Sequence, residues 1–337
     1  MKRSILFALT LMLSAASFGA ADTVGAVRLL LARRSSVDAR KYAAAVACVM
    51  EGARNGMLVP QFVAAVLSES SDWPASARLT PECRKAYLDR SRPYLQTVAE
   101  RENNALAWYL LYLDSHDETC LEKAADGGNP HALNQLGTRR LTVVLQDPDA
   151  DPKERREILR TSFSSFRRAA DQGDANGLNN LGICLQNGWG CVRDEAKAFD
   201  CFSRAAQKGH TEAINNLGRF YREGVYVEQN LKRALRCFRM AAEQGDVSGK
   251  INYLLAMIRG EGMPADVPQG IRLLERMASR GQVEAMDCLS ECYSTGLGTL
   301  EPNAAKSVLW MMRSRAAQGD ANAAEWLKEN HESTDDR

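Results

Sequence analysis

The sequence predicts an all-α protein, a right-handed superhelical solenoid of helix-pair repeats, and three observations predict it. First, Gly173, Gly209, Gly245 and Gly281 follow one another at intervals of 36 residues, and Gly319 comes after a further 38. Second, each of these glycines lies between two segments whose apolar residues recur at helical spacing. Third, no segment shows the strict alternation of a half-buried strand. A fixed period of this size that holds two amphipathic segments is typical of a helical solenoid.

Glycines are predicted to end both helices of each repeat. A helix commonly ends in a left-handed backbone conformation, which glycine adopts without steric cost. The glycines expected after second helices are Gly209, Gly245 and Gly281, and those expected after first helices are Gly188, Gly224, Gly260 and Gly296.

The apolar positions of the first helices predict a core seam. Leu181 lies one helical turn before Leu185, and Leu217 lies one turn before Tyr221, so each pair shares a helix face. Small residues beside this seam are expected to let the second helix approach closely, and they are Gly182, Gly218 and the pairs Ala205-Ala206, Ala241-Ala242 and Ala316-Ala317.

These recurring residues resemble the Sel1-like repeat family, a subfamily of the TPR-like repeats. The family pattern A-x-x-x-L-G-x-x-Y-x-x-G is matched by Ala213, Leu217, Gly218, Tyr221 and Gly224. The pattern's second half is matched by residues 188–209, with Cys201 where Trp is usual, and the unit at 282–319 keeps Ala285, Leu289, Tyr293, Gly296 and a closing Gly319. In the unit at 246–281, Tyr253 and Leu254 replace Leu-Gly. The resemblance covers about residues 105–319 and implies stacked helix pairs.

The chain is expected to divide into five parts. A signal peptide is predicted at its start and a helical region after it, which would shield the apolar end of the solenoid. Divergent repeats, one of them with a polar insertion (QDPDADPKERRE), precede the regular repeats, and a capping helix and tail follow them. The ranges are 1–21, 22–103, 104–173, 174–319 and 320–337.

The first residues have the layout of a secretory signal peptide. Lys2 and Arg3 precede an apolar run from Ile5 to about Ala16, and cleavage is expected near Ala20 or Ala21. The run is shorter than the roughly 20 residues that span a bilayer, which argues against a membrane anchor. The protein is therefore predicted to be exported, either to a periplasm or out of the cell, without stable membrane insertion.

The charge balance argues against nucleic acid as a partner. The chain has 43 Lys and Arg against 42 Asp and Glu. A nearly neutral surface of mixed sign has no general attraction for polyanions or for anionic lipid.

Motifs for catalysis, metal binding and cofactor binding are missing from the sequence. The four histidines, His116, His131, His210 and His331, have no Cys or carboxylate at a known metal spacing. No G-x-S-x-G and no S-x-x-K occurs. We therefore expect no metal, no cofactor and no enzymatic activity. The alternative is a cell-wall hydrolase or penicillin-binding protein, since Cys-rich members of the family have been linked to those activities.

The nine cysteines leave several possibilities open. The resemblance implies no disulfide framework, because the positions paired in Cys-rich family members are held here by Ala206 and Ile214, and by Ala242 and Lys250. Cys201 and Cys237 are interpreted as small buried apolar side chains. A bond from Cys184 to Cys191 or Cys201, and a bond among Cys48, Cys83 and Cys120, stay open.

One column of residues suggests a binding site. Asn180, Asn216 and Asn252 occupy the same place in three successive first helices, which line the concave side of a two-helix solenoid. An Asn amide can donate to and accept from an extended peptide backbone. Arg219, Arg222 and Arg259 could supply charge for an acidic or C-terminal group. The alternative is that each Asn bonds the backbone of a neighbouring repeat.

The function predicted from these features is that of a non-catalytic scaffold for protein–protein interaction. It would bind a peptide or partner protein on the concave face, in the cell envelope or outside the cell.

Overall fold

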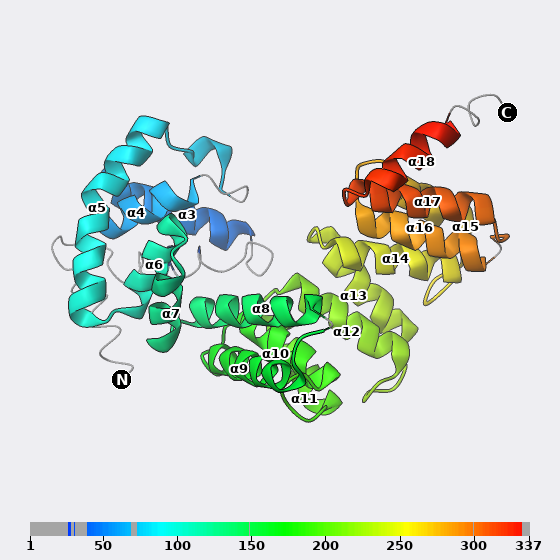
Figure 1. The fold of residues 1–337 in the computed structure, drawn as a ribbon, viewed down its shortest axis with the longest axis horizontal. Coiled ribbons are helices and arrows are strands. Elements are labelled where there is room, and N and C mark those ends of the chain that lie inside the picture. The colour runs from blue at the N-terminus through cyan, green and yellow to red at the C-terminus, as the bar shows by residue number, and fades with distance from the viewer. Residues whose placement is uncertain are drawn as a thin grey trace. The chain divides into compact units, whose positions relative to one another are not determined.

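The fold is all-α in the part of the chain that the structure describes. The computed structural model describes residues 26, 27, 30, 39–68, 73–147, 149–298 and 300–331, and none of these residues forms a strand. The predicted signal peptide lies outside the described residues. The chain divides into two compact units, Met1–His210 and Thr211–Arg337. Figure 1 labels their helices.

The first unit begins with helices of unequal length that show no regular repeat. Gly56, at φ +82°, follows the first of them, and Pro81 opens the long third helix, whose cap Thr80 accepts a hydrogen bond from the backbone N–H of Cys83. The helices are α3 (Ala39–Arg54), α4 (Leu58–Leu67), α5 (Pro81–Glu102), α6 (Ala105–Ser115) and α7 (Glu118–Asp126), with a 3-10 turn at Ala75–Ala77.

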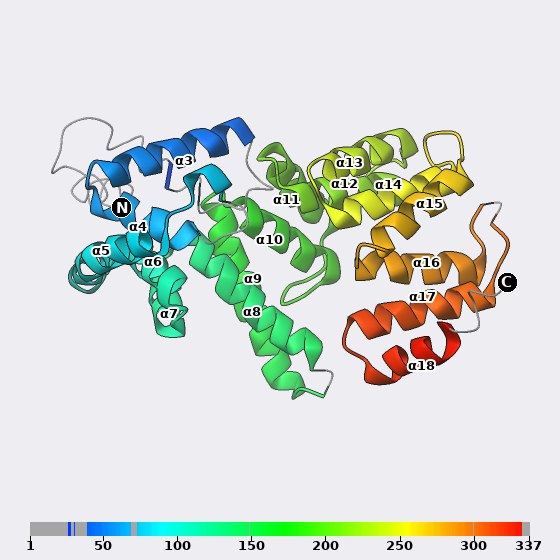
Figure 2. The ribbon, with the colours of Figure 1, turned by 90° about the horizontal axis from the view of Figure 1, so that it is seen from above.

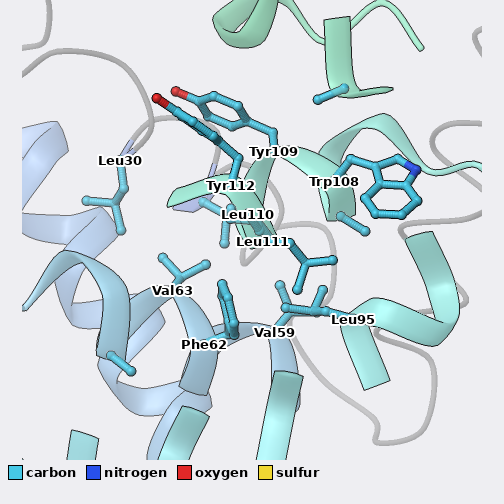
Figure 3. Close-up of a cluster of buried hydrophobic side chains, with 14 of the residues drawn as sticks. Leu30, Val59, Phe62, Val63, Leu95, Trp108, Tyr109, Leu110, Leu111 and Tyr112 are labelled. Carbon is cyan, nitrogen blue, oxygen red and sulfur yellow. The ribbon is translucent and has the colours of Figure 1, made fainter. Parts of the chain in front are cut away.

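A core of large apolar side chains joins these helices. Phe62 of α4 and Leu95 of α5 are fully buried beside Leu110 of α6. Figure 3 shows Tyr109 and Tyr112 lying side by side, with their hydroxyls pointing away from Phe62. The hydroxyl of Tyr112 accepts a hydrogen bond from Gln135 Nε2 at 2.7 Å. This region is thereby tied to α8, the first helix of the next pair.

Two helix pairs complete the first unit. The predicted polar insertion is largely helical, because its second half begins α9, and α8 and α9 have 17 and 20 residues where the next pair has 13 each. α10 packs against both α8 and α9. The four helices are α8 (Pro130–Gln146), α9 (Pro152–Asp171), α10 (Ala175–Asn187) and α11 (Glu195–Gln207).

The second unit consists of three more pairs and a last helix. Each helix contacts the next within the unit, and the first helices also contact one another, α12 with α14 and α14 with α16. α16, α17 and α18 lie side by side in Figure 2. The helices are α12 (Thr211–Glu223), α13 (Leu231–Glu243), α14 (Val247–Arg259), α15 (Val267–Ala278), α16 (Val283–Thr295), α17 (Ala304–Ala317) and α18 (Ala321–His331). Trp326 of α18, the predicted capping helix, is half-buried.

Aspartate and asparagine start most of these helices. In each case the side-chain oxygen accepts a hydrogen bond from a backbone N–H in the first turn, which satisfies a donor that has no partner within the helix. The capping residues of the repeats are Asp174, Asp194, Asn230, Asp246, Asp266 and Asn303.

The predicted close approach of paired helices is confirmed at Gly182 and Gly218. A Cβ atom at Gly182 would lie 2.7 Å from the ring of Phe202, and one at Gly218 would lie 2.5 Å from the ring of Phe238. Both rings are fully buried. The missing side chain of each glycine is therefore the space that a phenylalanine of the second helix fills.

The predicted core seam is confirmed in part. Leu181 and Leu185 are buried, and so are Leu289 and Tyr293 in the last pair. Leu217 and Tyr221 are half-buried, and the guanidinium of Arg233 lies 5.6 Å above the Tyr221 ring.

The glycines at the helix ends all have positive φ, as predicted, between +69° and +93° for the set Gly188, Gly209, Gly224, Gly245, Gly260, Gly281, Gly296 and Gly319. Tyr226 is unexpected in this respect. It has φ +62° and stands two residues after Gly224, where the neighbouring repeats have Gly190 and Gly262, also at positive φ. A side chain in this conformation costs roughly 1–2 kcal/mol.

Tyr226→Gly is expected to stabilise the unit 211–337. Both Tyr226→Gly and Tyr226→Ala remove the ring, which is 61% exposed, but only glycine also removes the Cβ that strains the backbone. We expect Tyr226→Gly to be more stable than Tyr226→Ala by about 1 kcal/mol. Urea denaturation of the two variants measures this difference directly. Equal midpoints would mean that the backbone at this position is not strained.

Candidate functional site

The three asparagines of the predicted ladder are half-buried on first helices, Asn180 on α10, Asn216 on α12 and Asn252 on α14. Asn180 belongs to the first unit, and the other two belong to the second. The column is thus divided between the two units.

Asn180 and Asn252 each connect neighbouring repeats. The amide Nδ2 of Asn180 donates to Asn134 Oδ1 on α8 at 2.8 Å, and that of Asn252 donates to Asn215 Oδ1 on α12 at 2.9 Å. The alternative interpretation named backbone groups as the partners, whereas both partners are asparagine side chains. An Asn amide has two donor N–H groups and one acceptor oxygen. Asn180 Nδ2 also donates to Thr138 Oγ1 at 3.4 Å, so the acceptor oxygen of Asn180 and the second donor of Asn252 are the groups left for a ligand.

The three arginines named from the sequence lie beside carboxylates of their own chain. Arg219 and Arg222 both face Glu223, at 3.8 and 3.1 Å, and Arg259 faces Glu261 at 3.8 Å. Arg222 also donates to Asn252 Oδ1 at 3.5 Å, which brings one predicted arginine to one predicted asparagine. Exposed ion pairs of this kind contribute less than about 1 kcal/mol, so an anionic ligand could replace Glu223 or Glu261.

A second set of polar contacts joins consecutive repeats at the helix starts. In the first unit His131 Nδ1 lies 3.3 Å from Asp174 Oδ2, and His210 Nε2 lies 3.1 Å from Asn176 Oδ1. Burial raises the pKa of Asp174, and the nearby His131 opposes that rise. Spacing in the sequence did not suggest this pair, because 43 residues rather than 36 separate its members.

In the second unit the position that matches Asp174 is Asp246, and the nearby charged residue is another acid, Glu212. Burial raises the pKa of Asp246, the N–H of Gly249 opposes the rise, and the charge on Glu212 adds to it. The folded unit therefore holds this proton more tightly than the unfolded chain does. It follows that the free energy of unfolding falls as pH rises from about 3.8 through the raised pKa, and stays lower above it.

Asp246→Asn is expected to stabilise the unit 211–337 at pH 7 by a few tenths of a kcal/mol, since asparagine keeps the helix cap and removes the charge. The gain should shrink as the pH is lowered toward 4. Thermal melts of wild type and variant between pH 4.5 and 7.5 test this, with Glu228→Gln, at an exposed loop position, as the control. A loss of stability at pH 7 would contradict the expected sign.

A groove in the first unit was not predicted. It has a volume of about 640 Å³, and α9, α10, α11 and the loop before α11 line it. Its apolar lining includes Phe163, Leu181 and Leu185, with Val192 at the loop. One feature of the sequence could have indicated this groove. Val192 is an apolar loop residue at a position where the next repeat has Glu228.

All nine cysteines lie within the described residues, and no disulfide bond joins any of them there. Cys201 is buried, as predicted, and Cys237 is half-buried. Cys191 and Cys201 were the two disulfide partners considered for Cys184. The thiol of Cys191 lies 3.5 Å from the backbone oxygen of Cys184, so Cys191 is a close neighbour of Cys184. Burial raises the pKa of Cys184 to about 12, which makes this thiol a poor nucleophile.

The described residues contain no cluster of three or more His, Cys, Asp or Glu side chains placed to hold a metal ion. None of the described helices combines the length and apolarity needed to cross a bilayer.

Comparison with protein families identifies four matches to the Sel1 repeat model, at residues 175–210, 211–246, 252–282 and 283–315. These matches contain α10 to α13, α15 and α16 in full and α14 and α17 in part, so they fall in both units. No curated protein matches the chain.

Solved structures similar to this chain include two repeat proteins. A Sel1 repeat protein from Oxalobacter formigenes is 26% identical, with a TM-score of 0.49, over 68% of this chain and 88% of the other. The protective antigen c5321 of uropathogenic Escherichia coli, which has an SLR fold, is 22% identical, with a TM-score of 0.50, over 86% of this chain. The match spans 60% of c5321, and this likeness shows a shared fold.

Proposed function

We propose, from the premise that this chain is a Sel1-like repeat protein, that it is a non-catalytic scaffold that binds a peptide or partner protein along its first helices. Sel1 repeats generally mediate protein–protein interaction, and their fold is typically a scaffold without catalytic residues. We further propose that the protein acts in the cell envelope or outside the cell, because its first 21 residues have the layout of a signal peptide.

The observation that carries the proposal is the recurring half-buried amide. Asn180, Asn216 and Asn252 place the same donor and acceptor group at intervals of 36 residues. Arg222 supplies a cation beside Asn252. Several weak contacts of this kind can add up along an extended ligand, whose backbone presents donors and acceptors at regular spacing.

The test is a cross-linked pull-down from envelope and culture-medium fractions. Three proteins are compared: wild type, the triple variant Asn180→Ala/Asn216→Ala/Asn252→Ala, and the double variant Asn134→Ala/Asn215→Ala. The double variant removes the two Asn–Asn hydrogen bonds between repeats but leaves the three predicted ligand-binding amides in place. It is therefore a matched control for lost stability.

We expect wild type and the double variant to capture the same partner, and the triple variant to lose it while remaining folded. Loss in both variants would mean that these asparagines act only in packing the repeats. Retention of the partner in the triple variant would contradict the proposed site.

A further inference from the structure

The groove between α9 and α11 has an apolar projection next to it on the same face. Val192 is 87% exposed, more than any other large apolar side chain in the part of the chain that the structure describes. It lies at the edge of a cavity of about 640 Å³ whose apolar lining comes from Phe163 of α9, Leu181 and Leu185 of α10, and Cys201 of α11. The positions of α9, α10 and α11 are shown in Figure 1.

The loop that carries Val192 is held firmly against the helices. A Cβ atom at Gly190 would lie 2.2 Å from the backbone oxygen of Leu159 in α9, so the loop backbone rests directly on that helix. On the other side of Val192, the N–H of Asp194 donates to the oxygen of Leu185 at 2.9 Å. A projection fixed at both ends loses little conformational entropy when it binds.

The charges around the groove are mixed and nearly balanced. Four cations and three carboxylates line it, namely Arg167, Arg193, Lys197, Arg204, Asp171, Asp194 and Asp200. Lys197 pairs with Asp194 at 2.9 Å, and Arg204 pairs with Asp200 at 3.6 Å. Arg167 and Asp171, one turn apart on α9, are exposed and form no ion pair within the described residues.

We propose that a second copy of this chain occupies the groove, so that two copies form a two-fold symmetric dimer in which each Val192 enters the groove of the other. A projection and a cavity on one face are self-complementary, and a two-fold axis satisfies both at once. In the proposed arrangement the axis crosses α9 between Arg167 and Asp171, so that Arg167 of each copy faces Asp171 of the other. The balanced rim permits this, whereas a rim of one sign would repel its own copy.

The size of the face predicts a weak dimer. Helices of 20 and 13 residues are roughly 30 and 20 Å long, and two neighbouring helices present a face about 20 Å wide, so each copy buries on the order of 500 Å². The total of about 1,000 Å² is near the lower limit of specific interfaces. We expect dissociation in the micromolar range.

Sedimentation velocity of the full-length chain between about 1 and 200 μM measures the association. We expect wild type to shift from monomer to dimer, and Val192→Glu to bind its own copy at least tenfold more weakly. Val143→Glu is the matched control, because Val143 is also an exposed valine, at 64%, and lies on α8 outside the groove. A wild-type protein that stays monomeric at 200 μM, or a dimer that Val192→Glu leaves unchanged, would overturn the proposal.

A charge exchange tests the two-fold arrangement itself. Arg167→Asp and Asp171→Arg each place like charges opposite one another and should weaken the dimer severalfold. The double variant Arg167→Asp/Asp171→Arg exchanges the signs and should restore it. Failure of this rescue, with all three variants folded as judged by thermal melts, would mean that the two copies do not meet in this orientation.

The dimer is independent of the proposed ligand site. Val192→Glu should leave the pull-down partner unchanged, and the triple asparagine variant should leave the dimer unchanged. Each proposal can therefore fail without the other.

Discussion

Gly190→Ala is expected to destabilise the unit 1–210 by about 3 kcal/mol, the sum of backbone strain and overpacking. Gly190 has φ +71°, and an added Cβ would lie 2.2 Å from the oxygen of Leu159 and 2.8 Å from the nitrogen of Arg160. Both atoms belong to the backbone of α9, so neither can move aside by changing a rotamer. The substitution therefore forces the loop and the helix apart.

Gly188→Ala is the control for this prediction. Gly188 also has positive φ, +73°, but the nearest atoms to its added Cβ lie 3.6 Å away. It should cost only the strain of the backbone, about 1 kcal/mol. Urea denaturation gives both values, and equal losses would show that the loop does not rest on α9.

Phe238→Ala is expected to destabilise the unit 211–337 by about 4 kcal/mol, because the ring is completely buried and its removal leaves a cavity. Gly218→Ala should cost about 2 kcal/mol, since its Cβ would lie 2.5 Å from the same ring. In the double variant the new methyl group enters the space that the ring has left. The double variant should therefore lose at least 1 kcal/mol less than the two single variants together.

Gly245→Ala combined with Phe238→Ala provides the additive reference. A Cβ at Gly245 would have no neighbour within 4 Å, so its cost should simply add to that of Phe238→Ala. If the Gly218 and Gly245 combinations behave alike, the glycine is not the counterpart of the ring.

The next repeat supports this interpretation with a substitution already present in the chain. Leu254 stands 36 residues after Gly218, and Leu274 stands 36 residues after Phe238. Both leucines are buried, at 2% and 0% exposure. Leu254 on the first helix is larger than Gly218, and Leu274 on the second helix is smaller than Phe238, so the two changes compensate. The departure from the Leu-Gly pattern at Tyr253-Leu254 is therefore a different solution to the same packing problem.

Features that depend on local backbone conformation were determined by the sequence itself. The 36-residue period, the helix pairs, the helix ends at glycine and the buried pair Leu181 and Leu185 were all predicted, and the structure confirms them. Each follows from what a residue type permits within its own helix or turn. The same information predicts the family and the type of function, but it names no ligand.

Contacts between repeats were decided only by the tertiary structure. Asn180 bonds Asn134 across 46 residues, whereas Asn252 bonds Asn215 across 37, because the polar insertion lengthens the earlier repeat. The groove and its projecting Val192 likewise combine α9, α10, α11 and a loop. Periodicity reports which side of its own helix a residue occupies. The partner that it meets depends on how far the neighbouring helix is shifted and turned, which side-chain packing decides.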